Sequence, residues 1–331
     1  MKRKNILIIA LLLTIGANSF GQSSEKNDQY TYTRNVVRTF TWGDGDYQLG
    51  YRKNNGGDYS ESVGPTSIVV SQNGDIYIQD YANNRILKYS NIGEYIRTYY
   101  YCNMGPIAVD SKDNLYVELR GNYIQGVDKE GISIGGLSYS LPASAYSKMA
   151  VDETKNKVAM WDPMIGGSKC IIDKPDLNGP FCTSKQKGFA VSRDITSKEF
   201  KNIVHTRDSN YYYLNGTIII MPFYREKQIK IVTAKDRIRH LCFLKENKQG
   251  DMLMQVDVTN NAKYLKKAII LDSKSKESIL IDIDQDERIY FSQDYGDFLL
   301  DMDENGNVYH LWIQSDGATL IKWSRTEITN E

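Results

Sequence analysis

The segment 301–307 (DMDENGN) comes closer than any other to a pattern that could do chemistry. Asp301, Asp303 and Asn305 carry oxygen side chains at alternate positions, and a glycine follows them. This pattern is the first half of a calcium loop, in which the glycine permits a sharp turn. The second half is missing, because Trp312 stands where the bidentate glutamate would be. A calcium site is therefore one interpretation. A hairpin turn built on Asn-Gly chemistry is the other, and we favour it.

A gathered catalytic set is not apparent elsewhere in the chain. The sequence has only three histidines, His205, His240 and His310, and none lies close to another. It has no G-x-S-x-G motif and no glycine-rich phosphate loop between a strand and a helix. We therefore expect no catalytic residue and no cofactor other than the possible calcium ion.

The four cysteines are not spaced for a thiolate metal site or a redox pair, because no Cys-x-x-Cys occurs. Cys170 and Cys182 flank a turn-rich segment, so a local hairpin could bring them together as a disulfide. We expect Cys102 and Cys242 to be buried free thiols.

The elements that would position any site are short strands. The apolar run 68–70 leads through Asn73-Gly74 into the alternating run 76–78, which predicts two strands joined by a two-residue hairpin turn. A third strand is expected at 85–89 and a fourth at 95–101. Together they would form one four-stranded antiparallel sheet.

This unit repeats with a period near forty residues. The end of its first strand recurs as Val70-Ser71, Val109-Asp110, Val151-Asp152 and Val191-Ser192. Its first turn recurs at Asp113-Asn114, Thr154 to Asn156, Asn215-Gly216, Gln249-Gly250 and Asn305-Gly306. Repeats of this length indicate a propeller, in which each unit is one blade. The sequence therefore predicts an all-β fold, a six-bladed β-propeller of four-stranded antiparallel blades.

The first unit resembles the NHL-repeat β-propellers. Pro65, Gly74, the strand 76–78, Asp80 and the segment 83–86 (NNRI) fall where that family has proline, glycine, an apolar strand, aspartate and an Asn-Asn-Arg turn. Later units match less well. The resemblance implies that the ring is closed by an N-terminal strand at 35–42 (NVVRTFTW), which would complete the last blade.

Propeller geometry also selects candidate binding residues. The loops between second and third strands should gather at one end of the central channel, opposite the Asn73-Gly74 turn. Tyrosine, arginine and asparagine are common in adaptable interfaces. The binding residues predicted in this way are Tyr81, Asn83, Arg120, Asn122, Asp162, Tyr224 and Arg225.

The N-terminus predicts export. Lys2, Arg3 and Lys4 precede an apolar core at 6–15 and small residues, so residues 1–21 read as a secretory signal peptide. Residues 22–34 would be a polar tether and 35–331 the propeller. No cysteine lies near the cleavage site, so the protein is not expected to be a lipoprotein or to stay inserted in a membrane. Removing residues 1–21 leaves 38 basic against 41 acidic residues, which makes nucleic acid an improbable partner.

Two functions fit these observations. The first is an exported, periplasmic or extracellular protein that binds a protein, peptide or glycan through one face without turnover. The second follows from the resemblance: metal-dependent lyases and lactonase-like hydrolases occur among related propellers and gather histidines and carboxylates over the channel. Whether His205, His240 or His310 lines the channel mouth distinguishes the two.

Overall fold

The computed structural model describes most of the predicted strands. The residues described are 30–52, 63–102, 104–119, 123–138, 148–152, 157–161, 169–173, 182–183, 203–205, 209–214, 217–222, 229–232, 237–260, 263–272, 278–283 and 299–328. The predicted signal peptide lies outside them. No helix in these ranges is long and apolar enough to cross a membrane.

The described strands form six sheets. The first contains β2 (Pro65–Val70), β3 (Ile76–Asp80), β4 (Arg85–Tyr89) and β5 (Tyr95–Tyr100), with the short 3-10 turn η2 (Tyr81–Asn83) between β3 and β4. The second contains β6 (Met104–Val109), β7 (Leu115–Leu119), β8 (Tyr123–Val127), β9 (Ser133–Ser138) and the added strand β13 (Cys182–Thr183). The third contains β10 (Lys148–Asp152), β11 (Lys157–Trp161) and β12 (Lys169–Asp173).

The remaining three sheets have four strands each. One contains β14 (Ile203–His205), β15 (Ser209–Leu214), β16 (Thr217–Pro222) and β17 (Ile229–Val232). Another contains β18 (Arg237–Glu246), β19 (Met252–Asn260), β20 (Lys263–Leu271) and β21 (Ser278–Asp282). The last contains β22 (Leu300–Met302), β23 (Val308–Gln314), β24 (Gly317–Glu327) and the N-terminal strand β1 (Tyr30–Thr41).

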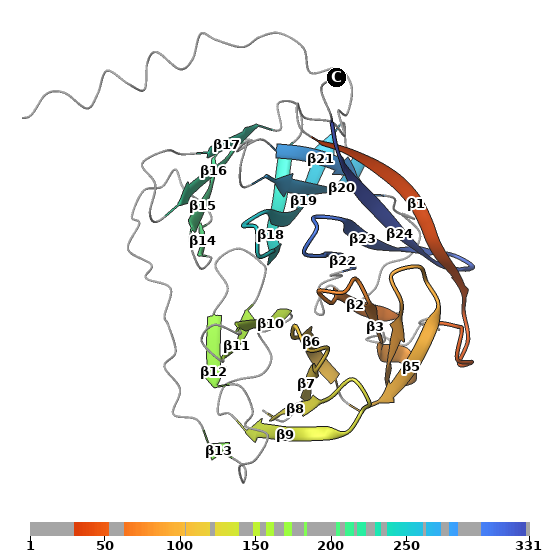
Figure 1. The fold of residues 1–331 in the computed structure, drawn as a ribbon. Coiled ribbons are helices and arrows are strands. Elements are labelled where there is room, and N and C mark those ends of the chain that lie inside the picture. Colours follow the sequence, from red (N-terminus) through yellow and green to blue (C-terminus); the bar gives the residue numbers. More distant parts are fainter. Residues whose placement is uncertain are drawn as a thin grey trace, which may run out of the picture.

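The sheets are arranged around a centre, as Figure 1 shows, and β2, β6, β10, β18 and β22 are the innermost strands of their sheets. β2 lies against β6 and β22, β6 lies against β10, and β18 lies against β22. Strands within a sheet follow one another in chain order and are antiparallel, apart from two added strands: the parallel β13, and β1, which pairs antiparallel with β24. This is the arrangement of a β-propeller. The all-β propeller predicted from the repeat is confirmed.

β1 is longer than the sequence indicated. It begins at Tyr30 rather than at Asn35 and pairs with β24 along its length, from Tyr30 opposite Glu327 to Thr41 opposite Gly317. Residues 30–34 are therefore strand, and not part of a polar tether. The pairing makes β1 the outer strand of the sheet that also holds the C-terminal strands.

The hairpin turns differ in type from the prediction. In the β2–β3 turn the Gly74 amide donates to the Ser71 carbonyl and the Ser71 amide donates to the Asp75 carbonyl. Only Gly74 has a positive φ (85°), and Asn73 does not. A two-residue Asn-Gly turn needs positive φ at both positions, so this is the three-residue loop whose last residue forms a G1 bulge.

The same bond pattern recurs in other turns. The residue with positive φ is Gly93, Asp113, Gly131, Gly250 or Gly306 in the turns after β4, β6, β8, β18 and β22. We had expected the turn Asn215-Gly216 to connect the first and second strands of its sheet. It lies outside the described residues, but the strands on either side of it, β15 and β16, are the second and third of that sheet.

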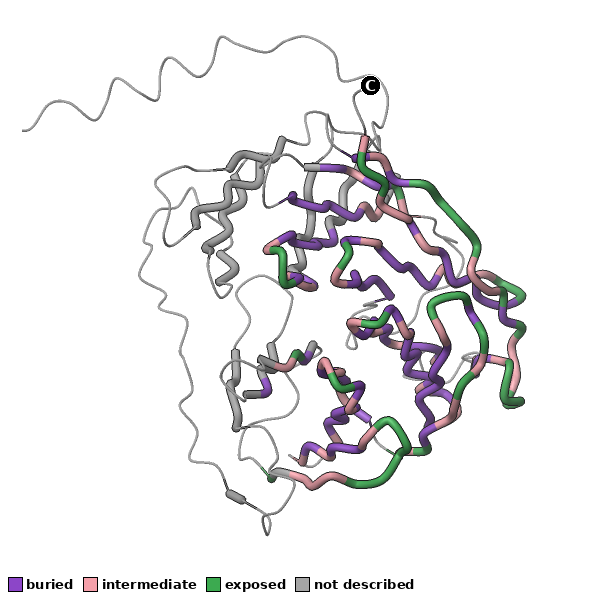
Figure 2. The backbone as a smooth tube through the Cα atoms, viewed as in Figure 1, coloured by how far each residue is buried: buried purple, intermediate pink, exposed green. Residues whose placement is uncertain are grey.

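The core lies between neighbouring sheets instead of at one centre. One cluster, around Ile68, Leu87 and Leu320, fills the boundary between the sheets of β2 and β22. A second, around Tyr77 and Val117, fills the boundary between the sheets of β2 and β6. Two more occupy the β6–β10 and β18–β22 boundaries. Figure 2 shows the buried residues concentrated on the strands that face these boundaries, whereas the hairpin between β4 and β5 is mostly exposed.

Cys170 and Cys182 do not lie on the two strands of one hairpin, as the sequence had suggested. Cys170 lies in β12, and Cys182 lies in β13, which pairs with β9 of a different sheet. Their side chains lie outside the description, so the disulfide remains a prediction. Cys102 is a free thiol but is exposed, so the expectation that it is buried was wrong. The expected burial of Cys242 stays a prediction, because its side chain is not described.

The positive φ of Gly74 generates the first test. Gly74→Val should destabilise the protein by about 1 to 3 kcal/mol, because a β-branched residue is strained at this φ. Gly74→Asn should cost less, since asparagine tolerates the left-handed region and Asp113 already occupies the equivalent position with φ 64°. The denaturation midpoints of the two variants check this. Equal midpoints would contradict the turn assignment.

Candidate functional site

A buried ion pair follows the β3 strand. Asp80 and Arg85 are almost fully buried, and the Arg85 Nε donates to the Asp80 Oδ2 over 2.8 Å. The other carboxylate oxygen of Asp80 accepts the Gly50 amide at 2.8 Å. Burial raises the pKa of Asp80, although the bond from Arg85 opposes that rise. Such a pair is stable only when the remaining donors are also satisfied.

The remaining donors of Arg85 hold the segment that follows β1. Its two terminal nitrogens donate to the carbonyls of Asp44, Gly45 and Gln48, at 2.8 to 2.9 Å. Asn83 donates to the Gly43 carbonyl at 2.8 Å and to Asp80 at 2.9 Å. The Asn-Asn-Arg turn, which suggested the family resemblance, therefore fixes the segment 43–50 against the first sheet. Asn83, predicted to bind a ligand, has its amide nitrogen engaged in this structural role.

The fixed segment presents Tyr47. Its ring packs edge-on against Tyr95, with 5.3 Å between the ring centroids, and the Arg38 guanidinium carbon lies 5.4 Å from the Tyr47 ring. The same guanidinium lies 5.0 Å from the ring of Tyr89 and 5.6 Å from that of Phe40. Arg38 also donates to the Gly93 carbonyl at 2.7 Å, which joins β1 to the β4–β5 turn. The result is an arginine surrounded by aromatic rings, a favourable cation–π arrangement.

Exposed apolar side chains occur on the three segments that meet at this cluster, and we call these side chains together the rim surface. They are Val36 on β1, Tyr47 in the segment 43–50, Ile92 in the β4–β5 turn and Ile96 on β5, with exposed fractions of 57, 59, 68 and 44%. Two other large apolar side chains are well exposed among the described residues, Tyr100 farther along β5 and Ile132 in the β8–β9 turn. Exposed apolar side chains on neighbouring segments make this region a candidate interaction site.

Two buried polar atoms beneath the rim surface have no hydrogen-bond partner. They are the Nε of Arg38 and the hydroxyl of Tyr89, a residue with no exposed surface. Burial raises the pKa of Tyr89, so its hydroxyl keeps its proton and remains a donor. Most buried polar groups in proteins have a hydrogen-bond partner, so each exception calls for a structural or functional explanation. Four other such atoms occur among the described residues, on Thr66, Tyr77, His310 and Trp312.

Of the other predicted binding residues, the structure describes only Tyr81. Tyr81 is half-buried in η2, directly before Ala82 and Asn83. Arg120, Asn122, Asp162, Tyr224 and Arg225 lie outside the described residues. The sequence did not identify the rim surface, because its members come from three segments with no common motif. The Asn-Asn-Arg turn was the one sequence feature that could have indicated this region. A buried arginine needs several acceptors, so Arg85 could have been expected to bind another segment of the chain.

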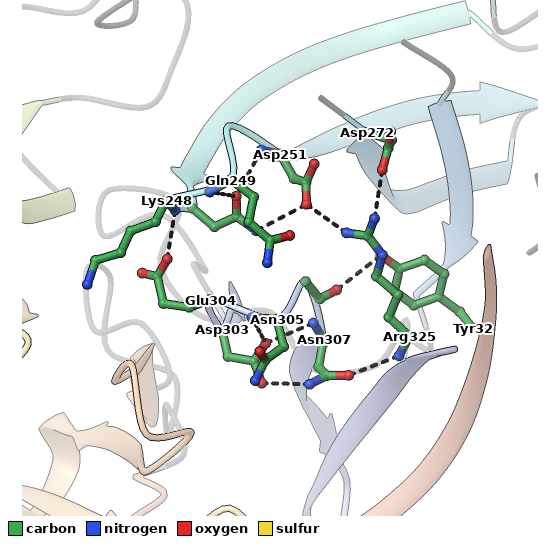
Figure 3. A network of polar contacts seen from close by, with 12 residues as sticks. Tyr32, Lys248, Gln249, Asp251, Asp272, Asp303, Glu304, Asn305, Asn307 and Arg325 are labelled. Carbon is green, nitrogen blue, oxygen red and sulfur yellow. Dashed lines mark hydrogen bonds and ion pairs between the residues drawn. The ribbon is translucent and has the colours of Figure 1, made fainter. Parts of the chain in front are cut away.

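The predicted calcium ligands have other partners. Asp303 Oδ1 accepts the amides of Asn305 and Asn307, and its Oδ2 accepts the side-chain amide of Asn307 (Figure 3). The same Oδ2 also accepts the hydroxyl of Tyr309. Asp301 instead accepts the Val70 amide at 2.6 Å and the Lys245 ammonium at 3.3 Å. Within the described ranges no three His, Cys, Asp or Glu side chains are grouped to hold a metal.

The Asp303 arrangement has a counterpart. Asp110 bonds the amides of Lys112 and Asn114, and also the Asn114 side chain and the Tyr116 hydroxyl. The repetition in a second turn supports a structural role for Asp303, as the favoured hairpin interpretation proposes.

Arg325, which the sequence analysis did not identify as important, lies beside the Asp303–Asn307 turn. Arg325, on β24, donates to Asp251 at 2.6 Å and to Asp272 at 2.7 Å, and both carboxylates belong to the neighbouring sheet (Figure 3). Its guanidinium carbon lies 3.5 Å from the centroid of the Tyr30 ring, and Tyr32 donates to the Gly306 carbonyl at 3.0 Å. The start of β1 thus contacts its own sheet, whose Arg325 in turn binds the neighbouring one.

His310 is a buried residue. It lies on β23, 6% exposed, and its Nδ1 has no hydrogen-bond partner. Burial first, and then the positive charges of Lys266 and Arg34, lower its pKa to about 3. The imidazole is therefore neutral at ordinary pH. The side chains of His205, on β14, and His240, on β18, are not described.

The Arg325 contacts predict a large effect on stability. Arg325→Met should destabilise the protein by about 3 to 5 kcal/mol, because Asp251 and Asp272 would remain buried without their cation. Lys322→Met is the matched control on the same strand, since Lys322 lies over the Tyr309 ring at 5.3 Å and should cost only about 0.5 to 1 kcal/mol. Chemical denaturation of both variants checks this. A similar loss in the two would contradict the assigned role.

His310 predicts an acid-sensitive fold. Its folded pKa lies below the ordinary value near 6.5, so the unfolded chain binds the proton more tightly. The stabilisation is present above about pH 6.5 and is lost as the pH falls toward about 3, by up to about 1.4 kcal/mol per pH unit. The unfolding free energy of His310→Gln should depend less steeply on pH in this window than that of the unsubstituted protein. Parallel pH profiles would show that His310 is not responsible.

Comparison with known proteins finds only distant structural likenesses. No protein-family model and no curated protein matches the chain. A structure of a protein of unknown function from Bacteroides thetaiotaomicron is 12% identical, with a TM-score of 0.45 over 89% of this chain and 76% of that one. A catalytically inactive virginiamycin B lyase from Staphylococcus aureus, solved with quinupristin, is 15% identical, with a TM-score of 0.42 over 85% and 84%.

A third similar structure is the extracellular domain of a putative hybrid two component system from B. thetaiotaomicron. It is 10% identical, with a TM-score of 0.36 over 78% of this chain and 40% of that one. At these identities and TM-scores the likenesses carry no argument about activity or ligand. The strand order and the arrangement of the sheets define the chain as a β-propeller, and its site must be interpreted from its own residues.

Proposed function

We propose that this chain is an exported, non-catalytic binding protein that recognises a protein, peptide or glycan partner. The single observation that carries the proposal is the rim surface: exposed apolar and aromatic side chains on segments joined by the half-buried Arg38, beside the buried Tyr89. Arginine and tyrosine are the residue types most often found at the energetic centre of interfaces. Binding here requires no metal or other cofactor, and the charge balance does not favour nucleic acid.

In this proposal the scaffold is a six-bladed ring related to the NHL-repeat propellers. The six sheets support six blades, and the pairing of β1 with β24 supports closure of the ring by the N-terminal strand. Closure also brings β1 against the β4–β5 turn, which builds the rim surface. The basic and apolar pattern of residues 1–21 supports export to the periplasm or beyond.

Screening of purified protein against a glycan array and a displayed library of linear peptides tests the proposal. The double variant Tyr47→Ala/Ile92→Ser should weaken binding of a selected ligand at least about tenfold, because anchors in the centre of a surface carry most of its energy. The control is Ile132→Ser, which removes an equally exposed side chain from the β8–β9 turn and should bind as the unsubstituted protein does.

Two results would contradict the proposal. If the rim variant binds normally while Tyr81→Ala does not, the binding surface lies instead on the loops between second and third strands. If the protein turns over a small ester or lactone in a metal-dependent reaction, the lyase or lactonase interpretation replaces this one.

A further inference from the structure

The outer edge of the sheet next to the rim surface is open. β5 is the last strand of its sheet, and no described strand pairs with its outer side. In the neighbouring sheet the equivalent edge is occupied: β13 adds to β9 in parallel, with Cys182 opposite Leu137 and Thr183 opposite Ser138 (Figure 1). The chain therefore already contains one extended segment that lies along the outer strand of a blade. An unpaired edge next to it is a template for the same kind of pairing.

The backbone groups that face outward on β5 can be identified. The Tyr101 amide donates inward to the Asn84 carbonyl at 3.0 Å. In antiparallel strands, residues with inward-facing and outward-facing backbone groups alternate. The amide and carbonyl of Tyr100, and those of Thr98, therefore point away from β4. These groups are available to a strand added from outside.

The side chains of β5 match such a ligand in chemical type. Ile96 belongs to the rim surface, and Tyr100 is 71% exposed at the other end of the strand. An extended peptide would gain affinity from main-chain bonds and specificity from alternate side chains. Apolar or aromatic side chains at those alternate positions would pack on Ile96 and, past the end of the strand, on Tyr47 and Ile92.

The shape of the edge favours a peptide over a second copy of the chain. The β4–β5 ladder is interrupted by a register shift between Lys88 and Tyr89, so its regular part runs only from Arg97 to Tyr100. Short, bulged and charged edges resist pairing with another rigid sheet. A flexible segment can follow the short regular part and then bend onto the rim surface.

We propose that β5 binds an extended peptide as an additional strand, with the rim surface receiving its apolar side chains. This inference rests on the proposed binding function and narrows the partner to a peptide segment, free or within a protein. It assigns the Thr98 and Tyr100 backbone groups as the main-chain contacts.

Proline substitution on the edge tests this assignment. Peptides of about ten residues, selected from a phage-displayed linear library on the purified protein, serve as the probe. Thr98→Pro removes an outward amide while leaving the inward bonds to β4 in place, as proline allows on an edge strand. It should weaken binding at least about tenfold, since one such bond and its geometry are lost. Thr98→Ala keeps the amide and should bind within about twofold of the unsubstituted protein.

Hydrogen exchange gives a second measurement that does not depend on the proline variant folding. On peptide binding, the Thr98 and Tyr100 amides should become protected, while the inward Tyr101 amide should change little. Unchanged exchange at Thr98 and Tyr100, or full binding by Thr98→Pro, would overturn the inference. If either result were obtained and the Tyr47→Ala/Ile92→Ser variant still lost binding, only the role of β5 would be wrong, and the proposed binding function would stand. Binding of glycans alone, or dimerisation through β5, would also overturn it.

Discussion

Buried cations that bind carboxylates across the boundary between neighbouring sheets are the interaction on which this propeller depends. Lys88 reaches Asp75 of its own sheet at 3.0 Å and Asp113 of the next at 3.3 Å. Arg325 joins the last sheet to Asp251 and Asp272 of the sheet before it. Apolar packing alone would let two sheets slide, because it is not directional. A buried charge has only one low-energy partner geometry, so each pair also sets the register of its boundary.

The first-hairpin turns show how a local rule and its exceptions shape the interior. Asp110 and Asp303 each accept a bond from the tyrosine six residues later, Tyr116 or Tyr309. The first sheet has Ser71 at this position, and the hydroxyl of Tyr77 is buried without a partner. The serine still bonds the Asp75 amide, so the turn forms. The Tyr77 hydroxyl therefore has no carboxylate acceptor in this turn. The carboxylate of this turn is Asp75, and it binds Lys88.

The site and the scaffold share the same residues, and this is one reason why we propose binding rather than catalysis. Arg85 and Asn83 hold the segment 43–50, and that segment presents Tyr47 at the outer edge of the first sheet. The buried polar groups of this region are largely engaged in holding one part of the chain against another. The rim surface instead offers apolar area, which can recognise the shape of a partner. The β5 edge offers main-chain groups, which can bind an extended backbone.

The sequence by itself determined the all-β fold, the strands of the first repeat and the positions of most turns, whereas the turn Asn215-Gly216 was assigned to the wrong pair of strands. These features depend on contacts within a few residues: alternating apolar side chains, a glycine where φ is positive, and an Asp or Ser that bonds amides two to four residues later. The type of turn and the start of β1 were missed, since both depend on bonds that composition does not specify. Only the tertiary structure decided which polar residues are structural. The carbonyl partners of Arg85 lie 37 to 41 residues away, and the carboxylate partners of Arg325 lie 53 and 74 residues away. Burial makes such pairs obligatory, and burial is a property of the assembled ring rather than of any one repeat.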